Sequence, residues 1–560
     1  ALIRGHAVPL DQSADPPGVS RGNLGHWQFI FHSLAWLDPL RRRWLATGDA
    51  SLIDTERALL ARQLAEFGTP PAERSPHPTY GFAWADMASA WRTMVLIAFA
   101  SAVGREPWLI TALDTHLDGL LDPCGYGGRG NHALHHCNAL ASVGLLLDRR
   151  NAVAIAQQRL AALRAQFFDD QGVTLEGSAA YHVLNMTWWR DTLRRNALIE
   201  AHGGAPLAGI PDGRAFLQDL IADDGRFVPI GDTMFQRNTV AAGLRARFGA
   251  EETARLLAPV PGRLDRARVG EGPQGRLAVY DDGYAFSRRI GADGARSFAT
   301  LRFGRGFAAR PHAHDDAGAL TFYAGGRRWL EDGGTYGYRG GAFRRFCRSQ
   351  PAHNCVIVEG ASYRRETPSA LLHRRFGARR SHVAVEVETL DETRWRRSIS
   401  HFGEPAALLV HDAIETRREG GIDAVWNLAT GVEIANWTDD RIDMMLGDER
   451  AVLLFAGDAA ANVHHFGSEN PLRGWRCVSR SSAVPVHSAW RRVEARSAVM
   501  AALLVALPPG LGFDALRVRR FAADATHVGI RLRLGETRFD HRMDMTKGRR
   551  TSGAPNQSAE

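Results

Sequence analysis

Apolar residues recur at three- and four-residue spacing through the first half of the chain, roughly residues 20 to 255. This spacing places them on one face of an α-helix. Short breaks that contain Gly, Pro and Asp separate the apolar segments. Helices joined in series by short connections indicate a helical toroid or solenoid. The predicted helices are 52–67, 84–102, 108–121, 132–147, 152–168 and 182–199.

The pattern changes after two Pro- and Gly-rich stretches, 259–262 and 270–275. Short alternating segments follow and predict strands of antiparallel sheets. A helical half followed by a strand half indicates an α+β chain with separate domains, as a length of 560 residues also implies. The predicted strands are 298–303, 319–323, 354–358, 383–388, 407–410, 451–456 and 498–506. The expected segments are a loop-like 1–20, a helical domain 21–262, a strand domain 263–546 and a disordered tail 547–560.

One hairpin would bring residues of metal-binding type together. Residues 320–332 read as two strands with a Gly-Gly pair at the turn. His312 and His314 are one residue apart, so we expect them on the same side of a strand. The hairpin would return Asp332 beside them, and His353 follows downstream. Imidazole plus carboxylate suits zinc, so the segment predicts a zinc site.

A Gly-rich turn runs into a predicted helix in the first half of the chain. Asn131 would lie at the N-cap or in the first turn, where its amide can serve the helix end or a ligand. His132 and His136 share a helical face, but the glutamate of the His-Glu-x-x-His metalloprotease pattern is absent. The alternative is a capping asparagine with solvated or core histidines. Likewise, Tyr181 could be a packing residue, and Asp232 could be part of a plain turn.

The charge balance favours an anionic partner. The net charge is +8 and the sequence pI is about 9.6, and Lys547 is the only lysine. A basic cleft attracts polyanions, and arginine binds carboxylates and sulfates in two-point contacts. A GC-rich coding sequence would also produce this arginine bias. No long basic run or nucleic-acid module is present, so we expect no nucleic-acid partner.

The cysteines and the apolar runs exclude two classes of protein. The 5 cysteines are odd in number, and a chain of this length needs no disulfide scaffold, so we expect mostly buried thiols. No apolar run approaches the roughly 18 residues that a membrane span needs.

In order and spacing, eight segments together resemble the heparinase II/III family of polysaccharide lyases, which includes exolytic alginate lyases. Each motif alone is unspecific, but the match extends over about residues 20 to 360. The resemblance implies an incomplete (α/α) toroid followed by an antiparallel β-sandwich, with the substrate cleft between them. The matching segments are 27–32, 84–92, 131–132, 176–182, 229–232, 312–314, 332–336 and 352–354.

The resemblance implies β-elimination at a uronic acid. A base removes the C5 proton, an acid protonates the departing C4 oxygen, and the carboxylate charge must be neutralised. Asn131 is expected to neutralise the carboxylate, and Tyr181 to serve as base and acid of syn elimination. His132 is the alternative base, and His312 and Tyr336 match further active-site residues. A tyrosine of ordinary pKa near 10 needs nearby cations to act as a base at neutral pH.

The resemblance also assigns metal and substrate contacts. His314, Asp332 and His353 match a metal set that is expected to hold zinc structurally. His135 stands where some relatives carry an acidic residue, which leaves the stereochemistry of the substrate open. The expected substrate-binding residues are His135, His182, Trp84, Arg92 and Arg310.

The expected function is a lyase that acts on an acidic polysaccharide or oligosaccharide. Alginate-like, glucuronan-like, exopolysaccharide and glycosaminoglycan substrates all remain open. Two alternatives are a non-catalytic glycan-binding or polymer-export factor and a zinc-dependent hydrolase whose metal activates water. A monomer or homodimer is expected in the periplasm or outside the cell. A cytoplasmic location is the alternative, because no signal-peptide pattern is present.

Overall fold

The computed structural model describes residues 2–3, 6–7, 21–70, 83–234, 238–260, 267–304, 312–338, 340–458 and 461–545. The chain divides into two compact units. The first comprises Ala1–Asp169 and Leu184–Pro211, and the second comprises Asp170–Val183 and Asp212–Glu560. Within the predicted N-terminal loop, two short strands, β1 and β2, pair with each other, and the predicted tail lies outside the described residues.

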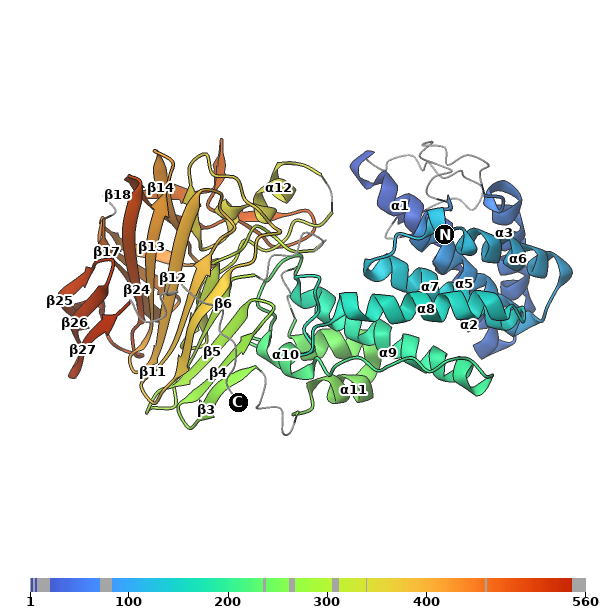
Figure 1. Cartoon of the computed structure of the whole chain (residues 1–560), viewed down its shortest axis with the longest axis horizontal. Coiled ribbons are helices and arrows are strands. Elements are labelled where there is room, and N and C mark those ends of the chain that lie inside the picture. The colour runs from blue at the N-terminus through green and yellow to red at the C-terminus, as the bar shows by residue number, and fades with distance from the viewer. Residues whose placement is uncertain are drawn as a thin grey trace, which may run out of the picture. The chain divides into compact units, whose positions relative to one another are not determined.

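The first unit is helical (Figure 1). Helix α5 packs against α1, α6 and α7, and α7 packs against α8. Their facing apolar side chains form one buried core that includes Leu60, Phe99, Leu113 and Leu140. The helices are α1 (Arg21–Ser33), α2 (Asp38–Thr47), α3 (Ala50–Phe67), α5 (Asp86–Val103), α6 (Pro107–Leu121), α7 (Gly130–Leu146) and α8 (Arg150–Phe167). Helix α9 (Ala179–Ala201) begins in the second unit and ends in the first.

Local signals explain where these helices begin and end. Asp49 caps α3 by accepting a hydrogen bond from the Ser51 amide, and Pro107 opens α6. Gly48 ends α2 with φ +74°, a conformation that suits glycine. All six predicted helices are confirmed, with ends shifted by at most three residues.

The second unit is built from antiparallel sheets. The eight-stranded sheet has the order β10-β11-β12-β13-β24-β17-β16-β15. Its strands are β10 (Ala370–Phe376), β11 (Arg380–Val387), β12 (Thr393–Gly403), β13 (Ala406–Thr416), β15 (Glu433–Trp437), β16 (Arg441–Leu446), β17 (Glu449–Gly457) and β24 (Ser497–Ala506). The six-stranded sheet runs in chain order through β3 (Arg268–Gly272), β4 (Gly275–Tyr280), β5 (Tyr284–Ile290), β6 (Arg296–Arg302), β7 (Leu320–Ala324) and β8 (Arg327–Leu330).

Two smaller sheets complete the layers. One consists of β18 (Ala461–Phe466), β23 (His487–Glu494), β14 (Gly421–Asn427) and β9 (Val356–Val358). The other consists of β25 (Leu516–Ala523), β26 (His527–Leu534) and β27 (Thr537–Asp544). Besides the pair of β1 and β2, two more pairs of short strands lie outside these sheets. They are β19 (Ser468–Glu469) with β20 (Leu472–Arg473) and β21 (Trp475–Cys477) with β22 (Ala483–Pro485).

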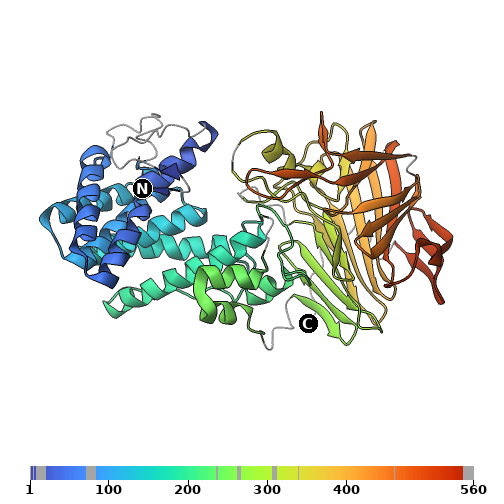
Figure 2. The same ribbon diagram turned by 180° about the vertical axis from the view of Figure 1, so that it is seen from behind.

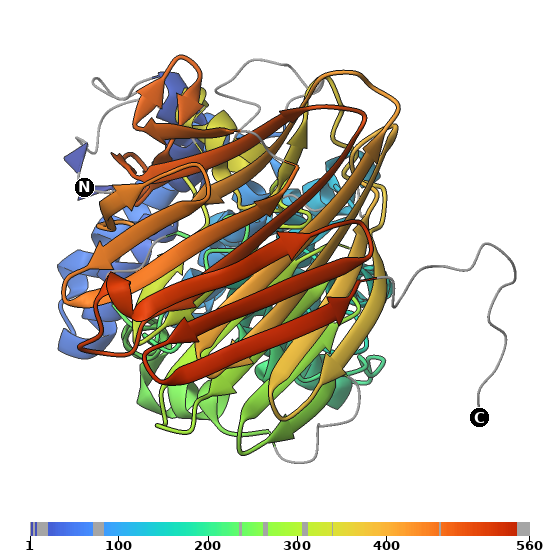
Figure 3. The ribbon, with the colours of Figure 1, turned by 90° about the vertical axis from the view of Figure 1, so that its left-hand side faces the viewer.

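The eight-stranded sheet is buried on both faces. One face shares a core with the six-stranded and four-stranded sheets, which includes Trp329, Trp395 and Trp426. The other face packs against β25–β27, the red strands in front in Figure 3, through side chains such as Leu503 and Ile530. The six-stranded sheet, green to yellow, is seen from behind in Figure 2. The predicted fold class, a helical part followed by an antiparallel β-sandwich, is confirmed, and every predicted strand overlaps an observed one.

The change from helices to strands lies between α11 (Val240–Leu257) and β3, close to the predicted boundary at 262. The compact units do not follow that boundary, because 170–183 and 212–257 pack with the strands. Helix α10 (Arg214–Asp219) shows why: its Phe216 ring contacts Tyr280 and Tyr284, and its Asp219 accepts a hydrogen bond from the Tyr280 hydroxyl at 2.8 Å. Among the described helices, none is long and apolar enough to cross a membrane.

Candidate active site

Two glycines allow three distant loops of the second unit to pack backbone against backbone. Gly231 has φ +56°, and a Cβ there would lie 2.2 Å from the carbonyl oxygen of Gly177 and 2.5 Å from that of His312. Gly177 has φ +74°, and its Cβ would lie 2.7 Å from that of Ala313. The amide of Asp232 donates to the His312 carbonyl over 2.9 Å. Only glycine permits such approaches, so these positions fix where the neighbouring side chains begin.

We expect Gly231→Ala to lower the free energy of unfolding by about 2–3 kcal/mol, because the new Cβ would overlap two carbonyl oxygens at a positive φ. Gly48→Ala is the matched control, since Gly48 also has a positive φ, +74°, but nothing lies within 4 Å of its Cβ. Its loss should be about 1 kcal/mol. Urea unfolding measures both. Equal losses in the two variants would show that the close approach of the loops contributes nothing.

Asp232 is the centre of the cluster. Its buried carboxylate accepts hydrogen bonds from His312 Nδ1 at 3.0 Å and His314 Nε2 at 3.1 Å. Thr335 Oγ1 donates over 3.1 Å, and both Nη atoms of Arg344 donate, one of them at 3.0 Å. Burial alone would raise the pKa of this carboxyl, but the hydrogen bonds hold the pKa of Asp232 well below its usual range. Asp232 is therefore ionised and orients both imidazole rings.

Two tyrosine hydroxyls meet beside this carboxylate. The ring of Tyr181, in the first turn of α9, stacks on His312 with centroids 3.4 Å apart and 11° between planes. Its hydroxyl lies 2.6 Å from that of Tyr338, which lies 3.5 Å from His312 Nδ1. The guanidinium of Arg344 lies 5.3 Å from the centre of the Tyr338 ring. Because Tyr338 is 55% exposed, solvent can reach the hydroxyl pair.

The pKa of Tyr181 is raised, not lowered as a tyrosine base needs, and the pKa of Tyr338 is raised as well. Burial raises the pKa of both, and the charge on Asp232 adds to the rise. The hydrogen bond from Tyr338 and the charge of Arg480 lower the pKa of Tyr181, whereas the bond to Tyr181 raises that of Tyr338. Either hydroxyl can donate to the other, and the one that keeps its proton stabilises its partner as a phenolate.

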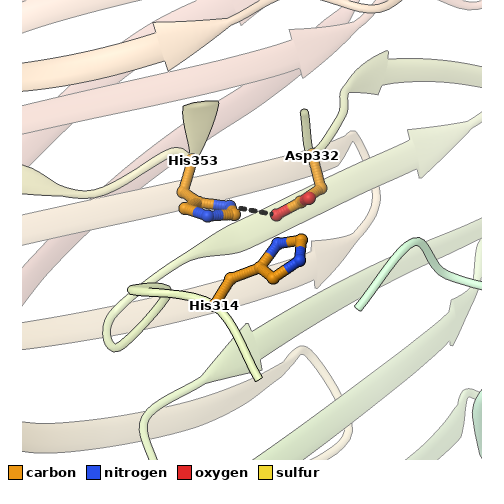
Figure 4. A group of neighbouring side chains, drawn as sticks. All are labelled: His314, Asp332 and His353. Carbon is orange, nitrogen blue, oxygen red and sulfur yellow. Dashed lines mark hydrogen bonds and ion pairs between the residues drawn. The ribbon is translucent and has the colours of Figure 1, made fainter. Parts of the chain in front are cut away.

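His314, Asp332 and His353 point toward one another (Figure 4). All three are buried, and each offers one donor atom within 4.8 Å of the others. His353 Nδ1 and Asp332 Oδ2 are hydrogen-bonded at 2.6 Å. His353 Nε2 and His314 Nδ1 are buried without a hydrogen-bond partner among the described residues. Two orphaned imidazole nitrogens beside a carboxylate fit a zinc ion.

The predicted hairpin is confirmed, and the predicted strand before it is wrong. Strands β7 and β8 join at Gly325 and Gly326, with φ +61° and +70°, and return the chain to Asp332. His312 and His314, however, lie in the loop between β6 and β7. Their backbone packs against the glycine loops instead of a neighbouring strand. The two rings still face one group, the carboxylate of Asp232.

Asn131, His132 and His135 are predicted site residues of the first unit. Asn131 lies in the first turn of α7, as predicted, and is 8% exposed, while His132 is exposed. The ring of His135 contacts Trp91 and Trp188 at 5.5 and 5.0 Å and lines a cavity of about 290 Å³. Burial lowers the pKa of His135 to about 4. No metal-binding group of three forms at His132 in the part of the chain that the structure describes.

Trp84 and Arg92, predicted to contact substrate, make packing contacts in the helical unit, and their substrate contact stays a prediction. The Trp84 indole N–H donates to the Phe67 carbonyl at 2.9 Å. Arg92 is 2% exposed, and its Nε donates to His116 Nε2 at 2.7 Å. The Arg92 guanidinium also lies 4.9 Å from the Trp84 ring centre, so both residues serve the helical core. The predicted substrate contact Arg310 lies outside the described residues.

His182 and Tyr336 also form hydrogen bonds within the protein. His182 is fully buried, Nδ1 is 2.9 Å from Thr174 Oγ1, and Nε2 is 2.9 Å from the Gly213 carbonyl. Both ring nitrogens are therefore used inside the protein, and the substrate contact of His182 stays a prediction. The Tyr336 hydroxyl donates to the Ser481 carbonyl at 3.0 Å. The tyrosine that meets Tyr181 is Tyr338, two residues farther along.

The sequence predictions missed Asp232, Tyr338 and Arg344. Asp232 ends the segment 229–232, which was matched without a role for its carboxylate. The glycine before Asp232 was a signal for this role, because an Ile-Gly-Asp sequence can form a tight turn that presents the aspartate carboxylate. Arg344 lies in α12 (Ala342–Arg348), where nothing in sequence separates it from its arginine neighbours.

Comparisons with known proteins agree with this architecture. Residues 292–495 match the family model described as Heparinase II/III-like, C-terminal. A heparinase III crystal structure has a TM-score of 0.72 and 16% identity, covering 97% of this chain and 86% of that one. A mutant heparan sulfate lyase from Pedobacter heparinus has a TM-score of 0.67 and 14% identity, covering 97% and 87%. A search of curated protein sequences found no match. At these identities the structures establish a shared fold.

Proposed function

We propose that this protein is a polysaccharide lyase acting on a uronate-containing acidic polysaccharide or oligosaccharide, because residues 292–495 match the family model described as Heparinase II/III-like, C-terminal. The observation that carries the proposal is the solvent-reachable hydroxyl pair of Tyr181 and Tyr338, held beside His312 by the ionised Asp232. The solved structures of the same fold are called heparinase and heparan sulfate lyase, which supports this class of substrate.

In the proposed β-elimination, Tyr181 acts first as base and then as acid. Its phenolate takes the C5 proton, the released electron pair forms the C4–C5 double bond, and the C4–oxygen bond breaks. The Tyr181 phenol then returns the proton to the departing oxygen, so atoms and charge balance without water. Tyr338 stabilises the phenolate by donating a hydrogen bond, and the stacked His312 ring restricts where the Tyr181 ring can lie.

The developing negative charge on the uronate must also be stabilised. We assign this role to the amide of Asn131, and the role of alternative base to His132, on the strength of the family resemblance. Asn131 opens a helix, whose N-terminus favours an anionic group.

The reaction is tested by incubating the protein with alginate, glucuronan, heparan sulfate and chondroitin sulfate. We expect at least one polymer to yield products that absorb in the ultraviolet band of unsaturated uronates. Product masses then distinguish elimination from hydrolysis, because hydrolysis adds water. Degradation without such absorbance would support the zinc-dependent hydrolase, and binding without degradation would support the glycan-binding protein.

We further propose that His314, Asp332 and His353 hold a structural zinc ion. The Nε2 of His314 carries the hydrogen that faces Asp232, which leaves Nδ1 for a metal. When bound, the ion would supply a fixed positive charge that anchors His314. Because Asp232 bonds both His314 and His312, this anchor would also hold the ring against which Tyr181 stacks.

We expect His353→Ala to abolish zinc binding, measured by elemental analysis, and to lower the melting temperature by more than about 5 °C. His202→Ala is the control, since His202 is exposed and bonds only the Leu198 carbonyl among the interactions described. It should leave zinc content and melting temperature unchanged. Equal zinc content in both variants, or a wild-type melting temperature that a chelator leaves unaltered, would rule out the structural metal.

A further inference from the structure

A hollow far along the chain from the tyrosine pair has four arginines among its twelve lining residues. It lies between the β10–β11 hairpin, at one edge of the eight-stranded sheet, and β27, at one edge of the three-stranded sheet. The volume is about 550 Å³, within the range of small-molecule sites. Its arginines are Arg375, Arg379, Arg380 and Arg542, and three histidines accompany them against the single acidic residue Asp544.

The four arginines of this hollow have no carboxylate partner among the described residues. Other arginines of the second unit's sheets, such as Arg397 and Arg441, do form ion pairs. Arg375 lies directly opposite His382 in the β10–β11 register, and Arg380 lies on the same face two residues before it. Burial and Arg375 lower the pKa of Arg380, and burial, Arg380 and His373 lower the pKa of His382 to about 3. The cations therefore repel one another.

The hollow is nevertheless rigidly built. The Arg289 side chain, 2% exposed, donates to the carbonyls of Gly377 and Ala378 in the hairpin turn, the first at 2.9 Å. The Gly377 amide also donates to the Arg380 carbonyl at 3.0 Å. These bonds fix the backbone of the turn that carries Arg379.

A second hollow continues the first. It has a volume of about 590 Å³ and shares Ala378, Arg379 and His541 with it. Arg538 adds a further positive charge, and Glu404 is the one acidic residue in its lining. Two hollows that meet at a shared arginine suit an extended chain with several anionic groups better than a single small anion.

We propose that these joined hollows are a second, non-catalytic binding site for a sulfated or carboxylated polysaccharide chain. Arginine forks bind sulfate and carboxylate oxygens in two-point contacts, and a polyanion would relieve the mutual repulsion of the cations. Nucleic acid fits less well, because single strands stack their bases on aromatic side chains. The two phenylalanines of the lining, Phe402 and Phe539, are 1% and 4% exposed. The site shares no residue with the tyrosine cluster and goes beyond the proposed lyase activity.

The test uses the full chain and fluorescent dextran sulfate oligomers, which carry sulfate but no uronate and so cannot be eliminated. Binding is expected in low salt, to weaken as salt rises, and to be absent with neutral dextran. The double variant Arg375→Ala/Arg380→Ala should weaken the Kd at least tenfold. It should not lower the melting temperature, because it removes like-charge repulsion. Failure of the lyase reaction would leave this result unaffected, so the two proposals fail separately.

Arg517→Ala/Arg519→Ala is the matched control, since both residues are exposed on β25 and line neither hollow. Its Kd should stay within twofold of wild type. Equal weakening in both double variants would mean that binding follows net charge and would overturn the proposal. The polysaccharide assignment would be overturned if a single-stranded DNA of equal charge bound as tightly and if the same double variant abolished that binding. Dextran sulfate should also protect Arg375 and Arg380 of the wild type from phenylglyoxal, and unaltered modification would count against the site.

Discussion

Tyr181→Phe should lower kcat/KM for ultraviolet-absorbing product formation by about 10³-fold, because it removes one hydroxyl that serves as both base and acid. The ring that stacks on His312 remains, so the melting temperature should stay close to that of wild type. The measurement is the initial rate of absorbance on the best polymer, at several pH values. A variant that keeps more than about a tenth of wild-type turnover would remove Tyr181 from the proton transfers.

Variants of two neighbouring tyrosines serve as comparisons for Tyr181→Phe. Tyr336→Phe removes a hydroxyl bonded to the Ser481 carbonyl and should change turnover only a few-fold. Tyr338→Phe removes the donor that lowers the pKa of Tyr181. The pKa of Tyr181 should therefore rise, and the rising limb of the pH–rate profile should move to higher pH. A profile that does not move would show that Tyr338 does not tune the base.

The regular elements were the part of the fold that the sequence predicted best. Helical spacing and strand alternation report local burial, and both periods persist through segments such as 132–147 and 498–506. The Gly-Gly turn predicted the hairpin because its residues adopt positive φ. The division into compact units was not predictable in this way. Helix α10 has helical spacing like its predecessors, and only its contacts with β4 and β5 assign it to the second unit.

The contacts of the active-site candidates could not be predicted where they depend on residues distant in the chain. Tyr336 and Tyr338 lie in an irregular segment, where no period decides which hydroxyl faces Tyr181. His182 is next to Tyr181, yet bonds to Thr174 and Gly213 bury it. The matched motifs include the loops that meet in the structure, where Gly177 and Gly231 allow their backbones to pack closely. They could not rank the side chains that those loops present.

Asp232 is also the residue of the cluster on which stability should depend most. Asp232→Asn keeps the shape but removes the charge that faces Arg344 and two imidazole rings. Leaving the Arg344 charge without its buried partner costs about 3–5 kcal/mol. We therefore expect a loss of this size in urea unfolding at pH 7, together with a large loss of turnover because His312 is no longer oriented.

The pH dependence has a definite sign. The pKa of Asp232 is depressed in the folded state, so its stabilisation is fully present above the unfolded-state pKa of about 4 and is lost as pH falls below that value. The stability difference between wild type and Asp232→Asn should hence be constant from about pH 5 to 7 and shrink toward pH 3. Asp540→Asn is the control, because Asp540 and its partner Arg531 are 61% and 62% exposed. An exposed pair of this kind contributes at most about 1 kcal/mol. If Asp232→Asn costs no more than Asp540→Asn at pH 7, the carboxylate does not hold the cluster together.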